Sequence, residues 1–161
     1  MQNIELMAPA GNFESLQAAL DNGADSIYFG VEQLNMRARA SINFTLDDLD
    51  EISNRCKAKN VRTYLTLNTI SYDHDLSIIK SLFNRAKDAD ITAVIAMDQS
   101  VINMARELGV EVHISTQINI TNIETVKFYA LFADTMVLSR ELSLRQVKKI
   151  TEQIEKNQIK G

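Results

Sequence analysis

The chain has 161 residues, with 17 Lys and Arg against 21 Asp and Glu, so its formal net charge is −4. A hydrophobic content of 45% and a charged content of 24% are typical of a folded domain and exclude long disorder. A single cysteine excludes an internal disulfide and cannot alone ligate a zinc ion or an iron–sulfur cluster. The acidic balance argues against a broad nucleic-acid surface, although it leaves room for a small local site.

No apolar run approaches the roughly 18 residues that a membrane-spanning helix needs. The first residues also lack the basic start and apolar core of a signal peptide. We therefore expect a cytoplasmic protein with no membrane partner.

Short β-branched and aliphatic runs alternate with stretches of helical period along the whole chain. Asn12 and Thr45 are suited to cap the first two helices, and Asn22 with Gly23 ends the first of them. Strands are predicted over residues 4–7, 26–29, 61–67, 92–97, 111–114 and 135–138. Helices are predicted from about residue 13, after residue 45, over 75–87, through 101–109, over 122–131 and over 144–154.

Six strand–helix units in strict alternation predict one α/β domain over residues 1–161 with a parallel sheet and right-handed crossovers. A doubly wound open sheet would carry a glycine-rich phosphate loop after its first strand. The segment 8–12 has neither the GxGxxG nor the GxxxxGK[ST] spacing of such loops. A TIM barrel needs eight units and typically about 250 residues. We therefore predict an incomplete TIM-barrel-like arc, the N-terminal part of a longer barrel protein.

The first and last strands of such an arc would have unpaired edges. We expect the missing C-terminal portion of the barrel, or a neighbouring copy in a homo-oligomer, to cover them.

Polar residues follow the strands, and parallel strands place their carboxyl ends, where ligands bind, at one edge. We expect six of these residues to converge on one mouth: Asn68, Asp98, Ser115, Gln117, Arg140 and Glu141. His113 precedes Ser115 by two residues and so points to the same side of the sheet, and Arg37 with Arg39 could clamp an anion.

Each of these residues also has a structural interpretation. Asn, Ser and Asp at strand ends commonly cap the next helix, and Arg140 with Glu141 could form an ion pair. His113 could be a buried structural histidine, and the two arginines could be solvated charges. His74 is expected to be exposed, and Cys56 to pack within a helix without a catalytic partner. Two histidines at unrelated positions predict no metal site.

Six ordered blocks of the sequence resemble the collagenase-like peptidases, catalogued as unassigned peptidase family 32. They are residues 5–12, 28–30, 34–39, 66–69, 113–117 and 137–142. The resemblance implies a barrel-like N-terminal domain and two activities. Some members of the family are reported to degrade collagen. Others are implicated in oxygen-independent hydroxylation of tRNA wobble uridine, ribosomal RNA cytidine or quinone precursors.

The resemblance also implies cofactors. Some hydroxylases of the family use an iron–sulfur cluster, and the RNA branch depends on prephenate. The cysteines that bind the cluster in the family come after the last residue of this chain, and Cys56 matches none of them. We therefore expect this chain to hold part of a pocket, without the redox centre, and to be inactive alone.

We rank hydroxylation of tRNA or rRNA first for the whole protein. In that hypothesis Asp98, His113 or Glu141 handles protons. The remaining candidates bind substrate or an anionic cosubstrate: Arg37, Arg39, Asn68, Ser115, Gln117 and Arg140. The alternative is a peptidase acting on collagen-like or other peptides, or hydroxylation of a quinone precursor. Against the peptidase, the sequence contains no GxSxG, no HExxH and no cysteine near a histidine. A scaffold without activity is the third hypothesis.

Overall fold

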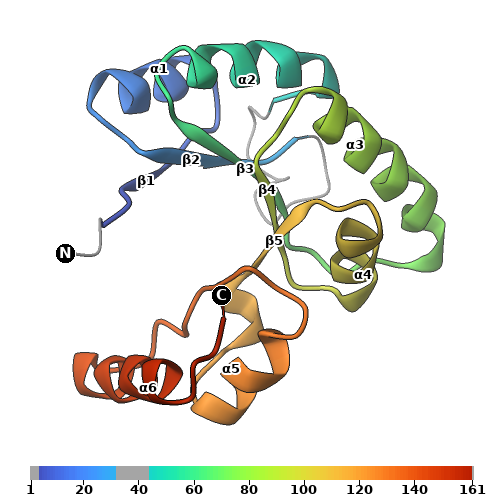
Figure 1. Ribbon diagram of the computed structural model, residues 1–161. Coiled ribbons are helices and arrows are strands. Elements are labelled where there is room, and N and C mark those ends of the chain that lie inside the picture. The colour runs from blue at the N-terminus through green and yellow to red at the C-terminus, as the bar shows by residue number, and fades with distance from the viewer. Residues whose placement is uncertain (1–3, 32–43, 161) are drawn as a thin grey trace.

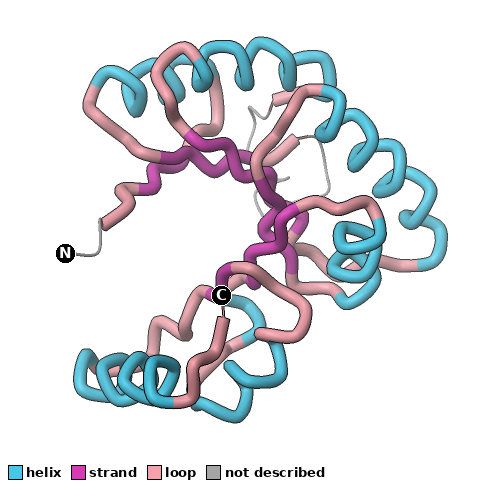
Figure 2. The backbone as a smooth tube through the Cα atoms, in the orientation of Figure 1, coloured by secondary structure: helices cyan, strands magenta, loops and turns pink. Residues whose placement is uncertain are grey.

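The computed structural model describes residues 4–31 and 44–160. Its six strands form one parallel sheet in the order β1-β2-β3-β4-β5-β6, curled into an arc (Figures 1 and 2). The strands are β1 (Met7–Pro9), β2 (Ser26–Phe29), β3 (Arg62–Leu67), β4 (Ala93–Ala96), β5 (Glu111–Ile114) and β6 (Thr135–Met136). The sequential order and the curvature confirm the incomplete TIM-barrel-like fold and exclude a doubly wound sheet.

The helices of the described residues lie on the convex face of the arc, and none of them covers the concave face (Figure 1). They are α1 (Phe13–Asp21), α2 (Leu49–Lys57), α3 (Leu76–Asp88), α4 (Gln99–Glu107), α5 (Ile123–Tyr129) and α6 (Leu144–Lys156). Short 3₁₀ turns precede α2 and α3 and follow β5: η1 (Leu46–Asp48), η2 (Asp73–Asp75) and η3 (Thr116–Ile118). Among the described residues, no helix has the length and apolar character to cross a membrane.

The main core lies between the convex face of the sheet and the helices. Helix α3 shows why these segments fold as they do, because its buried residues recur at helical spacing: Ile79, Leu82, Phe83 and Ala86. They pack with outward-facing strand residues such as Leu65 and Val94. Burying a large aliphatic or aromatic side chain of this kind contributes about 1.5–3 kcal/mol.

The first and last strands differ from their predicted bounds. Pairing of the first strand with the second begins at Leu6. The Leu6 carbonyl accepts hydrogen bonds from the N–H groups of Asp25 (2.9 Å) and Ser26 (3.3 Å). The Leu6 N–H donates to the Asp25 carboxylate at 2.8 Å. The ladder therefore runs from Met7 to Pro9, and Ile4 is 93% exposed. Pro9 lacks an N–H donor, which is tolerated because β1 pairs on one side with β2.

The sixth strand is shorter than expected because the chain leaves β5 early. The Val137 N–H still donates to the Ile114 carbonyl at 3.0 Å, but Leu138 bridges to Ile120 in the loop after β5. Ordered pairing with β5 thus ends at Met136.

We predict that Cys56 is unreactive in the folded protein. Its side chain is fully buried in α2, and this burial raises the pKa of the thiol to about 11. Alkylation by iodoacetamide at pH 8 should therefore be slow without denaturant and fast in urea. Rapid labelling of the native protein would contradict the packing of α2 on the sheet.

The same pKa predicts a stability change at alkaline pH. Because the folded-state pKa lies above the value of 9.0 expected for an unperturbed thiol, the neutral thiol stabilises the fold fully below pH 9. That contribution should disappear as the pH rises to about 11. The difference in unfolding free energy between the wild type and Cys56→Ala, measured by urea denaturation, should shrink across this interval.

Candidate active site

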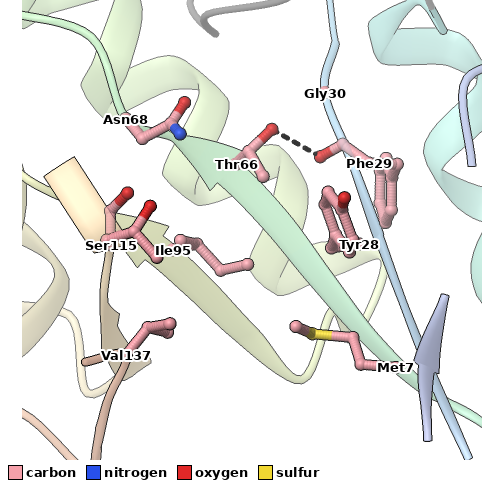
Figure 3. A pocket seen from close by; sticks show the side chains of 10 residues that line it. Met7, Tyr28, Phe29, Gly30, Thr66, Asn68, Ile95, Ser115 and Val137 are labelled. Atoms are coloured by element: carbon pink, nitrogen blue, oxygen red, sulfur yellow. Dashed lines mark hydrogen bonds between the residues drawn. The ribbon is translucent and has the colours of Figure 1, made fainter. Parts of the chain in front are cut away.

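A cavity of about 280 Å³ opens on the concave face, at and just beyond the carboxyl ends of the strands (Figure 3). Every one of the six strands, or the segment directly after it, contributes to its lining. The lining residues are Met7, Tyr28, Phe29, Gly30, Thr66, Asn68, Ile95, Ser115, Thr116 and Val137. This is where a parallel barrel-type fold places ligands.

The cavity has an apolar wall and a polar edge. Figure 3 shows the ring of Tyr28 and the side chain of Met7 on one side, with Asn68 and Ser115 on the other. Thr66 is fixed between them, since its hydroxyl donates to the Phe29 carbonyl at 2.9 Å. Such a site can hold a small flat molecule by its faces and hydrogen-bond it at one edge.

Asn68 and Ser115 are the predicted site residues that the cavity brings together. Ser115 is 3% exposed, and Gln117 fixes its hydroxyl. That hydroxyl donates to the Gln117 side-chain oxygen at 3.2 Å and accepts from the Gln117 N–H at 3.4 Å. Gln117 itself is not among the lining residues, so it orients Ser115 and does not face the cavity.

Asp98 caps α4 instead of lining the cavity. Its carboxylate accepts hydrogen bonds from the Ser100 N–H (2.9 Å), the Ser100 hydroxyl (2.6 Å) and the Ser71 N–H (3.2 Å). Partial burial works to raise the pKa of Asp98, but the hydrogen bonds from Ser100, Ser71 and Val101 outweigh it and lower the pKa. The carboxylate therefore stays ionised and occupied by its donors.

Arg140 and Glu141 lie on the surface after β6 and are both exposed. The Ser139 hydroxyl donates to the Glu141 carboxylate, and this hydrogen bond, with smaller help from Arg140, lowers the pKa of Glu141. Asp98, Gln117, Arg140 and Glu141 are thus not among the residues that line this cavity, and the site roles expected of them stay predictions. For Asp98 and Glu141 the reason is local, because nearby backbone and side-chain donors bond to their carboxylates. Arg37 and Arg39 lie outside the described residues.

His113 is buried on the concave face. It lies next to the cavity wall but is not among the residues that line the cavity. It pairs in register with Ile95 of the cavity wall and is 6% exposed. Its Nε2 lies 2.8 Å from the Glu111 carboxylate, and its ring centroid lies 4.5 Å from that of Tyr64. The prediction that it points to the same side as Ser115 holds, but its described partners belong to a separate polar layer.

Sequence reasoning missed this polar layer. Besides His113 and Glu111 it contains Tyr64, whose hydroxyl donates to Glu5 at 2.6 Å, and Arg62, which pairs with Glu5. Burial raises the pKa of Tyr64. Alternation within residues 62–66 and 111–115 was the available signal, since it places every second residue on one face.

The described residues do not fit a metal cofactor. They contain no group of three or more His, Cys, Asp or Glu side chains that could hold a metal ion. Cys56 is buried in the core on the convex side, away from the cavity face. No step of chemistry is assigned to an iron–sulfur cluster on these residues.

The fold and the cavity define a barrel-type α/β protein with a cavity at the carboxyl-end side of its parallel strands. The model of peptidase family U32 matches residues 11–160, and the chain belongs to this family. A solved U32 peptidase structure has the same architecture, with a TM-score of 0.74 at 16% identity over 93% of this chain and 65% of that one.

The curated relatives carry two kinds of names. A collagenase of Porphyromonas gingivalis is 50% identical over 100% of this chain and 39% of its own length. A tRNA hydroxylation protein of Helicobacter pylori is 32% identical over 93% of this chain and 36% of its own. A 23S rRNA 5-hydroxycytidine synthase of Escherichia coli is 30% identical over 91% and 22%. The chain thus spans less than half the length of these relatives.

We predict that Asp98 matters for stability through capping. Asp98→Ala should lower the unfolding free energy by about 1–2 kcal/mol, because helix α4 loses its N-cap. Asp98→Asn, which keeps an acceptor, should lose less. The free energy of unfolding measured in urea at pH 7 separates these variants.

The dependence of the unfolding free energy on pH below neutrality gives an independent check. Because the pKa of Asp98 is lowered in the folded state, its stabilisation is present above its unfolded pKa of about 3.9 and is lost as the pH falls through the folded value. In Asp98→Asn the unfolding free energy should not show this loss at low pH. A stable Asp98→Ala protein without activity would instead support the catalytic role predicted from the sequence.

Proposed function

We propose that this chain forms the substrate pocket of a cytoplasmic enzyme that hydroxylates a pyrimidine base in RNA, either the tRNA wobble uridine or an rRNA cytidine. One observation carries the proposal: a cavity of about 280 Å³ sets an aromatic and apolar wall against an amide and hydroxyl edge. A nucleobase has flat apolar faces and a hydrogen-bonding rim, and enzymes that modify bases bind them in pockets of this kind. The relatives named for tRNA and rRNA hydroxylation support the same substrate class.

The proposed roles follow from the positions. Tyr28 stacks on the base, and Asn68 with Ser115 binds its edge. His113 remains the proposed proton-handling residue, with Glu111 orienting its ring. Arg37, Arg39 and Arg140 are proposed to hold the carboxylates of prephenate as anionic cosubstrate. An iron–sulfur cluster would have to be held by residues other than those described.

A peptidase is the second candidate, and the 50% identity to a protein named collagenase favours it. The described side chains offer little support for nucleophilic hydrolysis. The Ser115 hydroxyl is bonded to Gln117, and His113 is bonded to Glu111. Cys56 is buried. A serine or cysteine nucleophile needs an adjacent base, and among the described contacts neither Ser115 nor Cys56 is bonded to one.

The two outer strands of the sheet indicate where a partner could pair with the chain. Within the described residues β1 pairs with β2 alone and β6 with β5 alone. We propose that further strands of the longer protein, or a neighbouring copy in a homo-oligomer, pair with these edges.

We predict that Tyr28→Ala in the whole protein lowers RNA hydroxylation about tenfold or more, because base stacking on an aromatic side chain contributes about 1–3 kcal/mol. Tyr28→Phe should retain most activity, and Lys80→Ala on the exposed side of α3 should retain all of it. The readout is the gain of one oxygen atom in the RNA, detected by mass spectrometry of nucleosides.

Gelatin and collagen peptides, incubated with the same protein preparation, test the alternative. Cleavage of these peptides without RNA modification would overturn the hydroxylase proposal. Unchanged hydroxylation by Tyr28→Ala and by Asn68→Ala would instead overturn the assignment of this cavity as the pocket for the base.

A further inference from the structure

The segment between β3 and α3 begins at the polar edge of the cavity. It begins at Asn68, which lines the cavity, and the Ser71 N–H then donates to the Asp98 carboxylate at 3.2 Å. Asp98 lies just beyond the carboxyl end of β4, so this segment runs from the end of one strand to the end of the next. Residues 72–75 follow directly and therefore lie beside the carboxyl ends of β3 and β4, and we call them the rim.

Two aromatic rings stand exposed on this rim. Tyr72 is 62% exposed, and the side chain of His74 is 81% exposed. The rings are parallel within 4°, with centroids 5.7 Å apart, so they are offset and present a wide flat surface. Neither ring packs in either core cluster, and both leave π faces open to solvent.

The backbone holds this pair in place. The Tyr72 N–H donates to the Asp75 carboxylate at 2.9 Å, and the Asp75 N–H donates to the Tyr72 carbonyl at 2.8 Å. The other oxygen of the Asp75 carboxylate lies 3.5 Å from His74 Nε2. A stacking surface that is fixed before binding loses less conformational entropy when a ligand arrives.

We propose that Tyr72 and His74 form a stacking platform for a nucleotide that flanks the base in the cavity. This inference rests on the proposed function and extends it, because it assigns the neighbouring base a binding surface. Every base has a π face, so stacking on such rings tolerates any sequence. A peptide side chain would instead need a groove, and these residues form a flat rim.

The charges near Tyr72 and His74 favour ring stacking over phosphate contacts as the way in which the platform binds a nucleotide. Asp73 and Asp75 flank His74, and the segment carries no Lys or Arg between Asn68 and Leu76. Phosphate contacts at this place are therefore unfavourable. The contribution of the platform should come from ring stacking, and it should depend little on salt concentration.

The test uses the whole protein and a short single-stranded RNA that carries the target pyrimidine with 2-aminopurine on one side or the other. Stacking on the platform should quench the fluorescence at one of the two flanking positions. Tyr72→Ala should remove that quenching and weaken RNA binding roughly tenfold at every salt concentration. Tyr72→Phe keeps the ring and should behave as the wild type, and Lys80→Ala serves as the surface control.

Three outcomes would overturn the platform. In the first, Tyr72→Ala quenches the 2-aminopurine fluorescence and binds the RNA as the wild type does, while hydroxylation continues. The platform then fails and the proposed function stands. In the second, Tyr72→Ala weakens binding of a peptide and leaves RNA binding unchanged. In the third, the wild-type protein binds no RNA, and the proposed function fails together with the platform.

Discussion

Parallel pairing of neighbouring strands is the constraint on which the rest of this structure depends. Each strand must return to the same end of the sheet, and right-handed crossovers that always advance in the same direction along the sheet place the connecting helices on one face. The convex face therefore becomes the helix-packed core, and the concave face is left for polar and aromatic side chains. The register fixes which of them meet, as in the pairs Tyr28 with Tyr64 and Ile95 with His113.

The same constraint gathers polar residues at the carboxyl ends, but the length of the following loop decides what they do. Asp98 stands directly before α4, and its carboxylate bonds to the N–H of Ser100 in the first turn. Asn68 is followed by several residues before the turn at Asp73–Asp75, so it does not stand at the N-cap of the next helix. It lines the cavity instead. Ser115 does both, since its hydroxyl accepts from the Gln117 N–H in the turn that follows β5 and it also lines the cavity.

This distinction explains how far the sequence could predict the molecule. Helical and strand periodicity identified all six units and their order, because these are local signals reinforced by burial. The first strand was placed too early, since its register depends on Asp25, nineteen residues away from Leu6. The site could be predicted only in part, because some of its residues follow from local signals and others depend on contacts between distant residues. Ser115 and Asn68 follow from strand ends, whereas the partners of His113 depend on side-chain geometry across the sheet.

The hydrogen bond between His113 and Glu111 also limits what that histidine can do in the proposed reaction. An ionised carboxylate only accepts hydrogen bonds, so the Nε2 atom facing it must carry the proton. In the neutral ring Nδ1 is then an acceptor, which makes the imidazole suited to take up a proton rather than to supply one. Glu111 would stabilise the cation formed by that uptake. Direct contact of His113 with a base in the cavity would have to come through Nδ1, because Nε2 is occupied.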